Sequence, residues 1–237
     1  DCPVPHVATR LHSDSDLKEI FVDAVRRATP AGTHVLLFPP LFLNDELPKA
    51  IEEASGCTVA ECLATTEPTA GLRLHTAIVK TLEPLCDVFW MSEIKSKVSR
   101  KRVEAIYGCK RGSQDWEELK GERFVLATGK FFGGGISLGF DEIREKVFGL
   151  PVFSDRQTCV QRRVQLDWNS NEFCDAQPWA TLGVGVDSRW RPVDRTGRPV
   201  YENLVACGSV IGGIDYAKAG MGLGFMAYSG RQCALVG

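Results

Sequence analysis

Two glycine-rich segments are the part of this chain whose residue types and spacing could bind a ligand through backbone atoms. Six glycines lie between residues 129 and 149 and seven between 208 and 230, which is more than half of the 23 in the chain. Glycine permits positive φ angles and close backbone approach, and it weakens helices and strands that need neither. We therefore expect two loops that either pack tightly on neighbouring backbone or surround a flat or phosphorylated ligand.

The elements around these glycines favour a ligand. Residues 124–128 form an apolar run that predicts a strand, and residues 203–207 predict a second strand. After Gly224, residues 225–234 can form a helix. Backbone N–H groups and the dipole at a helix N-terminus attract an anion or a carbonyl oxygen. This order of elements predicts such a site, with a purely structural packing loop as the alternative.

Several segments of the sequence resemble a known family. The segments "FVLATG" and "YENLVACGSVIGG…AGMGLGFMAYSGRQCA" resemble the two return segments of two-dinucleotide-binding-domain flavoproteins. Further motifs resemble the B-subunit family of anaerobic (quinone-linked) glycerol-3-phosphate dehydrogenases, namely "LLFPPLF", "PTAGLRLH", "ATGKFFGGGI", "IREKVFGLPV" and "QPWATLGVGVD". Together these motifs extend over nearly the whole chain.

The resemblance implies an α/β fold of the FAD/NAD(P)-binding type. Residues 121–237 would form the C-terminal portion of a doubly wound flavin-binding domain, and residues 1–120 an inserted substrate or cap region of α/β structure plus β-hairpins. The GxGxxG pattern that holds the FAD pyrophosphate in this fold is absent from the sequence. We therefore expect the C-terminal fragment of a longer subunit.

The implied cofactor is a flavin, either FAD or FMN. Its backbone and side-chain contacts would come from the two glycine segments, at Thr128, Gly129, Gly208, Ser209, Gly212, Gly213, Gly220, Met221, Gly222, Leu223 and Gly224. Two positions depart from related flavoproteins. Ser209 stands where many of them carry an acidic residue for the ribityl chain. Asp215 and Ala219 stand where fumarate reductases carry a His and an Arg, so succinate or fumarate chemistry is not expected.

The implied reaction is oxidation of sn-glycerol 3-phosphate to dihydroxyacetone phosphate, which needs a hydride acceptor, a base and cations for the phosphate. Arg73, Lys130 and Lys218 are the candidate phosphate ligands, although each could equally be a surface cation. His75 and Asp215 are the candidate bases, with His34 as a further histidine that opens an apolar strand.

The resemblance also implies partners. A catalytic A subunit and an iron–sulfur, membrane-anchoring subunit would pass electrons to quinone, because this chain has no cysteine spacing for a cluster of its own. The protein would be cytoplasmic and peripheral to the inner face of the membrane through these partners. The alternative is a non-catalytic flavin-carrier or assembly subunit of the same complex.

Composition excludes other classes. The net charge of −2 gives no reason to expect nucleic-acid binding, and the longest uncharged stretches are about a dozen residues, too short to span a membrane. The nine cysteines, an odd number without a CxxC pair, are expected to be mostly reduced and buried.

The elements that must position these residues fall into two parts. Up to residue 82, patterns predict a helix that is N-capped within Asp14-Ser15-Asp16, a buried strand over 34–38, and a helix over 46–54 that ends at Gly56. They also predict an extended segment over 58–63 and a helix over 72–82 that follows a turn at 67–71. From 88 to 127 the pattern predicts hairpins, with strands over 88–91, 95–102, 103–109 and 123–127. The basic residues of these hairpins are expected to form a solvated face.

Overall fold

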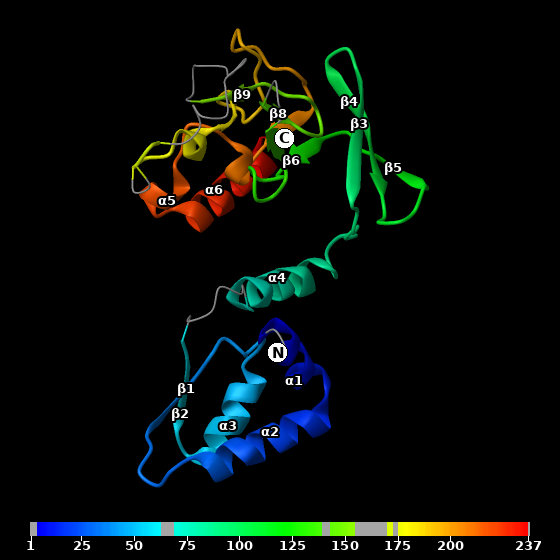
Figure 1. Ribbon diagram of the computed structural model, residues 1–237. Coiled ribbons are helices and arrows are strands. Elements are labelled where there is room, and N and C mark those ends of the chain that lie inside the picture. Colours follow the sequence, from blue (N-terminus) through cyan, green and yellow to red (C-terminus); the bar gives the residue numbers. More distant parts are fainter. Residues whose placement is uncertain (1–3, 63–68, 139–142, 155–169, 173–174, 237) are drawn as a thin grey trace. The chain divides into compact units, whose positions relative to one another are not determined.

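The computed structural model describes residues 4–62, 69–138, 143–154, 170–172 and 175–236. The chain is mixed α/β, as the sequence predicts, and it forms two compact units, Asp1–Phe89 and Trp90–Gly237 (Figure 1). Gly139 of the first glycine segment lies outside the described residues.

The first unit combines helices with a small parallel sheet. Its elements are α1 (Val4–Ser13), α2 (Ser15–Ala28), β1 (Val35–Phe38), α3 (Glu46–Ser55), β2 (Thr58–Glu61) and α4 (Thr69–Leu82). β1 and β2 pair in parallel, from Val35 opposite Thr58 to Phe38 opposite Glu61. The core between the helices and the sheet consists of Leu11, Leu41, Phe42, Leu47 and Ile51.

Two predicted helix boundaries of this unit are confirmed. The side chain of Asp14 caps α2 by accepting a hydrogen bond from the Leu17 amide at 3.0 Å. Gly56 ends α3 in the left-handed conformation, with φ 69°, which a residue with a Cβ adopts only at a cost.

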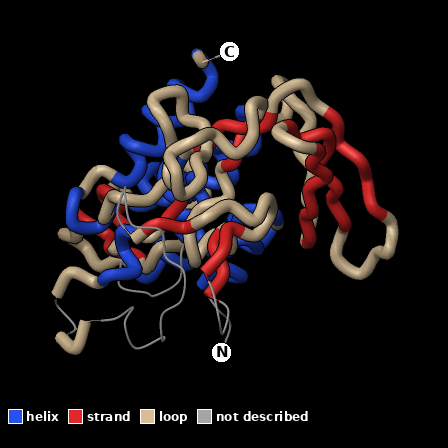
Figure 2. Tube along the Cα trace, turned by 90° about the horizontal axis from the view of Figure 1, so that it is seen from above, coloured by secondary structure: helices blue, strands red, loops and turns tan. Residues whose placement is uncertain are grey.

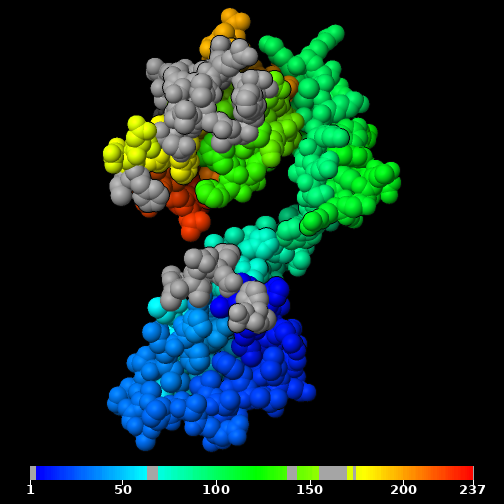
Figure 3. Space-filling model, in the orientation of Figure 1, coloured from blue at the N-terminus to red at the C-terminus, as the bar shows by residue number. Residues whose placement is uncertain are grey.

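Two predictions for this unit are wrong in detail. The strand over 34–38 exists but is only half covered, because Val35 and Leu37 are 57% and 65% exposed while the alternate residues face the core. The expected turn at 67–71 is helical from Thr69 onward, so α4 begins three residues early. On α4 (cyan to teal in Figure 3) the apolar side chains of Leu74 and Ile78 are about half exposed, at 47% and 48%.

The second unit is built from short strands, with two helices at its end. Its elements are β3 (Glu93–Ser99), β4 (Arg102–Cys109), β5 (Trp116–Lys120), β6 (Phe124–Leu126), β7 (Ile136–Leu138), β8 (Ile143–Glu145), β9 (Val152–Phe153), η2 (Pro178–Thr181), β10 (Gly183–Val184), β11 (Leu204–Ala206), η3 (Gly208–Val210), α5 (Tyr216–Ala219) and α6 (Gly222–Leu235). β3, β4 and β5 form an antiparallel sheet that stands beside the rest of the unit in both Figure 1 and Figure 2. β6 and β11 form a parallel pair.

The hairpin region differs from the prediction at both ends. Residues 88–91 form no strand, and β3 begins at Glu93. β5 was not predicted, because its sequence, Trp116-Glu-Glu-Leu-Lys120, is mostly charged. It pairs with β4 from Ala105 to Cys109, so hydrogen bonding to a neighbouring strand overrides its weak intrinsic preference.

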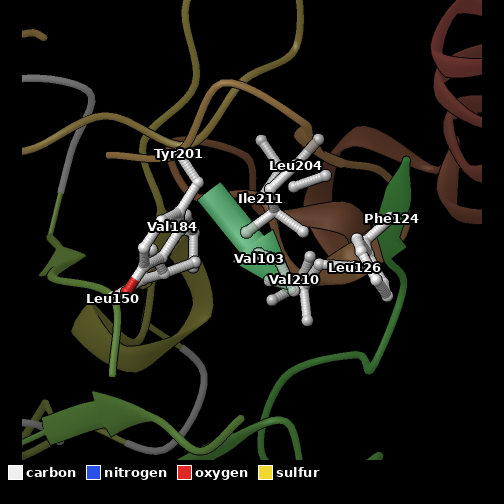
Figure 4. Close-up of a cluster of buried hydrophobic side chains, with 10 residues drawn as sticks. Val103, Phe124, Leu126, Leu150, Val184, Tyr201, Leu204, Val210 and Ile211 are labelled. Carbon is white, nitrogen blue, oxygen red and sulfur yellow. The ribbon is translucent and has the colours of Figure 1, made fainter. Parts of the chain in front are cut away.

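The main core of the second unit joins the hairpin sheet to the parallel pair. Val103 from β4 packs with Phe124 and Leu126 from β6 and with Leu204 from β11 (Figure 4). Asn203, 8% exposed, completes the junction with its side chain. Its Oδ1 accepts from the Val103 amide at 2.9 Å, and its Nδ2 donates to the carbonyls of Val103 at 2.9 Å and Glu122 at 3.2 Å.

Candidate functional site

The parallel pair β6–β11 brings the two glycine segments together. Leu126 lies opposite Ala206, and the Cys207 amide donates to the Leu126 carbonyl at 3.0 Å, so both strands end at the same edge. Each strand is followed by its glycine loop. The two loops touch, since a Cβ on Gly129 would lie 3.5 Å from Ser209 Oγ. The contact between the segments follows from two strands that the sequence predicts.

Some glycines of the site serve backbone packing. A Cβ on Gly133 would lie 2.6 Å from the Thr128 carbonyl oxygen, and one on Gly135 would overlap the Gly129 carbonyl. A Cβ on Gly212 would lie 2.9 Å from the carbonyl oxygen of Gly183, where β10 crosses the second loop. Such distances admit no side chain. Close packing therefore explains why Gly133, Gly135 and Gly212 are glycines, and Gly212 is one of the predicted flavin contacts.

Other glycines of the site have free space where a side chain would stand. Gly208 and Gly220 have positive φ angles of 74° and 61°, and no atom of the described residues lies within 4 Å of a Cβ built on either residue or on Gly224. The nearest atom to such a Cβ on Gly222 is Tyr216 Cβ at 4.0 Å. The space beside these residues is therefore available to a ligand.

The N-terminus of α6 lies among these open glycines. α6 begins at Gly222, three residues before the predicted start, so Gly222, Leu223 and Gly224 form its first turn, whose N–H groups have no partner within the helix. The apolar side chains of Met221 and Leu223 are 49% and 70% exposed beside it. Ser229 fixes the helix to the second glycine loop, since its Oγ accepts from the Gly208 amide at 2.9 Å.

One buried polar atom of the site lacks a partner. The hydroxyl of Thr128 is fully buried and makes no hydrogen bond to any described residue. Thr128 directly precedes Gly129, where the two loops meet. A buried hydroxyl without a partner is costly, and a bound ligand with a carbonyl or hydroxyl group would satisfy it. Together with the open glycines and the unpaired amides of α6, it fits the polar edge of a flavin.

Lys130 and Tyr216 connect three segments around the site. Lys130 Nζ donates to the carbonyls of Ala180 at 2.6 Å and Ile214 at 3.2 Å, and it lies 4.8 Å from the centre of the Tyr216 ring. Burial lowers the pKa of Lys130 to about 8, although the negative charge of Asp215 acts in the opposite direction. Burial also raises the pKa of Tyr216 to about 12. The ammonium of Lys130 is thus engaged by loop carbonyls.

Two further predicted residues lie at α5: Asp215 directly precedes this helix and Lys218 is part of it. Asp215 caps this helix, because its Oδ1 accepts from the backbone amide of Lys218 at 3.0 Å. The side chain of Lys218 is exposed. The structure therefore brings Asp215 close to Lys130 but holds the Asp215 carboxylate in a structural hydrogen bond.

Arg73 and His75 lie on α4, and His34 directly precedes β1, all in the first unit. Arg73 Nη1 donates to Glu61 Oε2 at 2.8 Å and to the Phe42 carbonyl at 2.9 Å. Its Nε and Nη2 make no hydrogen bond to the described residues, so half of the guanidinium stays available for an anion.

A cavity of about 470 Å³ lies beside the second glycine loop, and sequence reasoning missed it. Its walls include Gly212, Trp190 and one face of α6, formed by Phe225, Tyr228 and Gln232. The ring centre of Trp190 lies 6.3 Å from that of Phe225 and 6.0 Å from that of Tyr228. The sequence contains one signal for this cavity, the aromatic residues Phe225 and Tyr228 three positions apart on α6. No sequence pattern indicates that Trp190, with φ 62°, joins them.

Comparison with known proteins agrees with this geometry. Residues 88–224 match the family described as FAD binding domain. The chain is 28% identical over 183 residues to the B subunit of anaerobic glycerol-3-phosphate dehydrogenase from Actinobacillus pleuropneumoniae serotype 5b (strain L20), which covers 76% of this chain and 41% of that protein. The proteins of the same name from Yersinia pestis and Pasteurella multocida (strain Pm70) are each 27% identical, and both comparisons cover 87% of this chain.

The similarity covers only part of each relative. The chain spans less than half the length of the relatives just named, with 47% of the Yersinia protein and 48% of the Pasteurella protein covered. No solved structure matches the chain. No helix in the described part of the chain has the length and apolar character needed to cross a membrane. Because the family match extends over more than half of the residues, the chain belongs to the FAD binding domain family and is a flavoprotein whose cofactor is FAD.

Proposed function

We propose that this chain is part of a flavin-dependent dehydrogenase subunit that converts sn-glycerol 3-phosphate to dihydroxyacetone phosphate. The observation that carries the proposal is the meeting of the two glycine loops at the ends of β6 and β11, with the buried, unpartnered Thr128 hydroxyl at their junction and the first turn of α6 beside the second loop. The similarity to proteins named as the B subunit of anaerobic glycerol-3-phosphate dehydrogenase supports the substrate.

The bound flavin would accept a hydride from C2 of the substrate, and the chain would supply the remaining groups. Thr128 and the amides of Gly222–Gly224 would hold the flavin through hydrogen bonds, and Gly208 would lie against it on the side where it carries no side chain. The Nε and Nη2 of Arg73, which make no hydrogen bond to the described residues, would bind the substrate phosphate, with exposed Lys218 as a further cation. His75 or Asp215 would take the proton of the substrate hydroxyl. In this proposal residues 1–120 form the substrate region and residues 121–237 the flavin region.

The partners in this proposal are a catalytic A subunit and an iron–sulfur, membrane-anchoring subunit, through which electrons reach quinone. The relatives are named as one subunit of an enzyme, which supports an assembly. The chain would then be cytoplasmic and peripheral to the membrane.

A second candidate function is a non-catalytic flavin carrier or assembly subunit of the same complex. Two observations favour it. Lys130, a predicted phosphate ligand, is engaged by loop carbonyls, and Asp215, a predicted base, caps a helix, so both side chains already have structural hydrogen bonds in the described structure.

Reduction of the bound flavin by substrate distinguishes the two functions. Anaerobic addition of glycerol 3-phosphate to the purified flavoprotein should bleach its visible flavin bands, and Arg73→Ala should raise the substrate concentration needed for bleaching. If the wild-type flavin stays oxidised without the A subunit and is reduced only in its presence, the carrier function replaces the catalytic one.

A further inference from the structure

We infer that Lys130 is a positioning residue that holds the flavin loops in their binding arrangement, so that FAD binds tightly only while its side chain is charged. This inference rests on the proposed function, with FAD bound between the two glycine loops, and deepens it. It replaces the role of phosphate ligand that sequence reasoning gave to Lys130.

The first support is the geometry of the contacts. The ammonium binds the carbonyl of Ala180 in η2 and the carbonyl of Ile214 after the second glycine loop, which lie 50 and 84 residues away along the chain. Lys130 itself follows Gly129 of the first glycine loop. One cation therefore joins three segments that no regular sheet connects at this point.

The contact extends through Tyr216 to the open part of the site. The ring of Tyr216 lies under the Lys130 ammonium, and its hydroxyl donates to the carbonyls of Ile211 at 3.1 Å and Gly208 at 3.3 Å. Gly208 has a positive φ and free space among the described residues where a side chain would stand. Lys130 and Tyr216 thus fix the conformation of the loop at the position where a ligand would approach it.

Charge is essential to this arrangement. An ammonium has three N–H donors, enough for two carbonyls and one contact with the π face of the ring. A neutral amine turns a lone pair toward one of these electron-rich partners. Among the described residues, the charged and titratable groups that face it are Asp215, whose carboxylate favours the charged form, and Tyr216, which stays neutral below a pKa of about 12.

The expected effect on affinity follows from the protonated fraction. Burial brings the pKa of Lys130 to about 8, so most of the side chains are charged at pH 7 and only about one in ten at pH 9. If the charged form alone binds, the apparent dissociation constant rises by the inverse of that fraction, roughly tenfold from pH 7 to pH 9.

The test is a titration of the purified, flavin-depleted protein with FAD at pH 7 and pH 9, followed by flavin fluorescence. The wild type should bind about tenfold more weakly at pH 9. Lys130→Met should bind weakly at both pH values, and Lys130→Arg, charged at both, should lose the pH dependence. Lys146→Met, at an exposed lysine of the same unit, is the matched control and should follow the wild type. A wild-type affinity that is equal at pH 7 and pH 9 would overturn the inference, and this result needs no variant.

A second readout does not depend on flavin. In the segments that Lys130 joins, the Gly212 amide donates to the Val184 carbonyl at 3.0 Å, and the Gly213 amide donates to the Thr181 carbonyl at 2.8 Å. Their hydrogen exchange, corrected for intrinsic rates, should be at least about tenfold faster in Lys130→Met than in Lys146→Met, and faster in the wild type at pH 9 than at pH 7. Unchanged exchange in both comparisons would refute the positioning role. A wild type that binds no FAD at pH 7 would instead refute the proposed function, while the exchange experiment still decides the role of Lys130.

Discussion

Substitution of Asn203 tests how the hairpin sheet is joined to the strands that carry the glycine loops. The Asn203 side chain is 8% exposed and makes three hydrogen bonds, two of them to the backbone of Val103, which is 2% exposed. Asn203→Ala leaves the amide and carbonyl of Val103 without these partners. A buried backbone group without a partner costs about 1–3 kcal/mol, so the expected loss is about 2–4 kcal/mol in the free energy of unfolding.

Asn203→Asp makes the test specific to hydrogen bonding. A carboxylate can still accept from the Val103 amide, but its second oxygen faces the carbonyls of Val103 and Glu122 instead of donating to them. At pH 7 this variant should be less stable than Asn203→Ala. Burial raises the pKa of a carboxyl group, so the loss should shrink as the pH falls and the carboxyl becomes a donor.

Urea unfolding and hydrogen exchange of the Val103 amide measure these effects, with Asn171→Ala at an exposed asparagine as the control. The exchange measurement reports the junction even if the two units of the chain unfold separately. The reasoning is refuted if Asn203→Ala stays within about 0.5 kcal/mol of the wild type with unchanged Val103 exchange. An Asn203→Asp variant as stable at pH 7 as Asn203→Ala would refute the assigned orientation of the amide.

Three further predictions concern Gly183, Glu145 and Arg73. Gly183→Ala, whose Cβ would overlap the Gly212 backbone, should lower the free energy of unfolding in urea by at least about 2 kcal/mol. Gly134→Ala, at a residue with φ 77° and open space, should lower it by about 1 kcal/mol. Equal losses in the two variants would contradict the packing role of Gly183. Burial raises the pKa of the Glu145 carboxyl above its ordinary value of 4.5. The free energy of unfolding should therefore fall as the pH rises from 4.5 through the higher pKa of the folded state. Compared with Glu145→Gln across pH 4–7, the wild type should lose relative stability with rising pH, and a constant difference would argue against a buried, titrating carboxyl. In the catalytic protein Arg73→Ala should raise KM for glycerol 3-phosphate more than it lowers kcat, and steady-state kinetics showing an unchanged KM would remove Arg73 from the phosphate site.

Local signals in the sequence account for much of the fold. Asp14 and Gly56 mark helix ends through hydrogen bonding and backbone conformation that operate within a few residues, so both were predictable. The apolar runs that became β6 and β11 were also predictable, and their parallel pairing explains why the two glycine segments meet. Pairing partners were not predictable for β5, whose five residues become a strand only beside β4.

The roles of individual glycines and charges in the site depended on contacts between distant residues. Sequence reasoning assigned the glycines of both segments one role, yet Gly212 packs against Gly183 while Gly208 lies open, and nothing local distinguishes them. Lys130 was a plausible anion ligand by its position after a glycine. Its real contacts, the carbonyls of Ala180 and Ile214, lie far away in sequence.

The most direct test of the central claim, that the two glycine loops form a flavin site, is the visible absorption spectrum of the purified protein together with the mass of the released cofactor. We expect flavin bands, one FAD per chain, and a clear loss of bound FAD in Thr128→Val, which removes the buried hydroxyl while keeping the side-chain shape. A colourless protein that does not take up added FAD would contradict the claim, and so would a Thr128→Val variant that retains FAD with unchanged affinity.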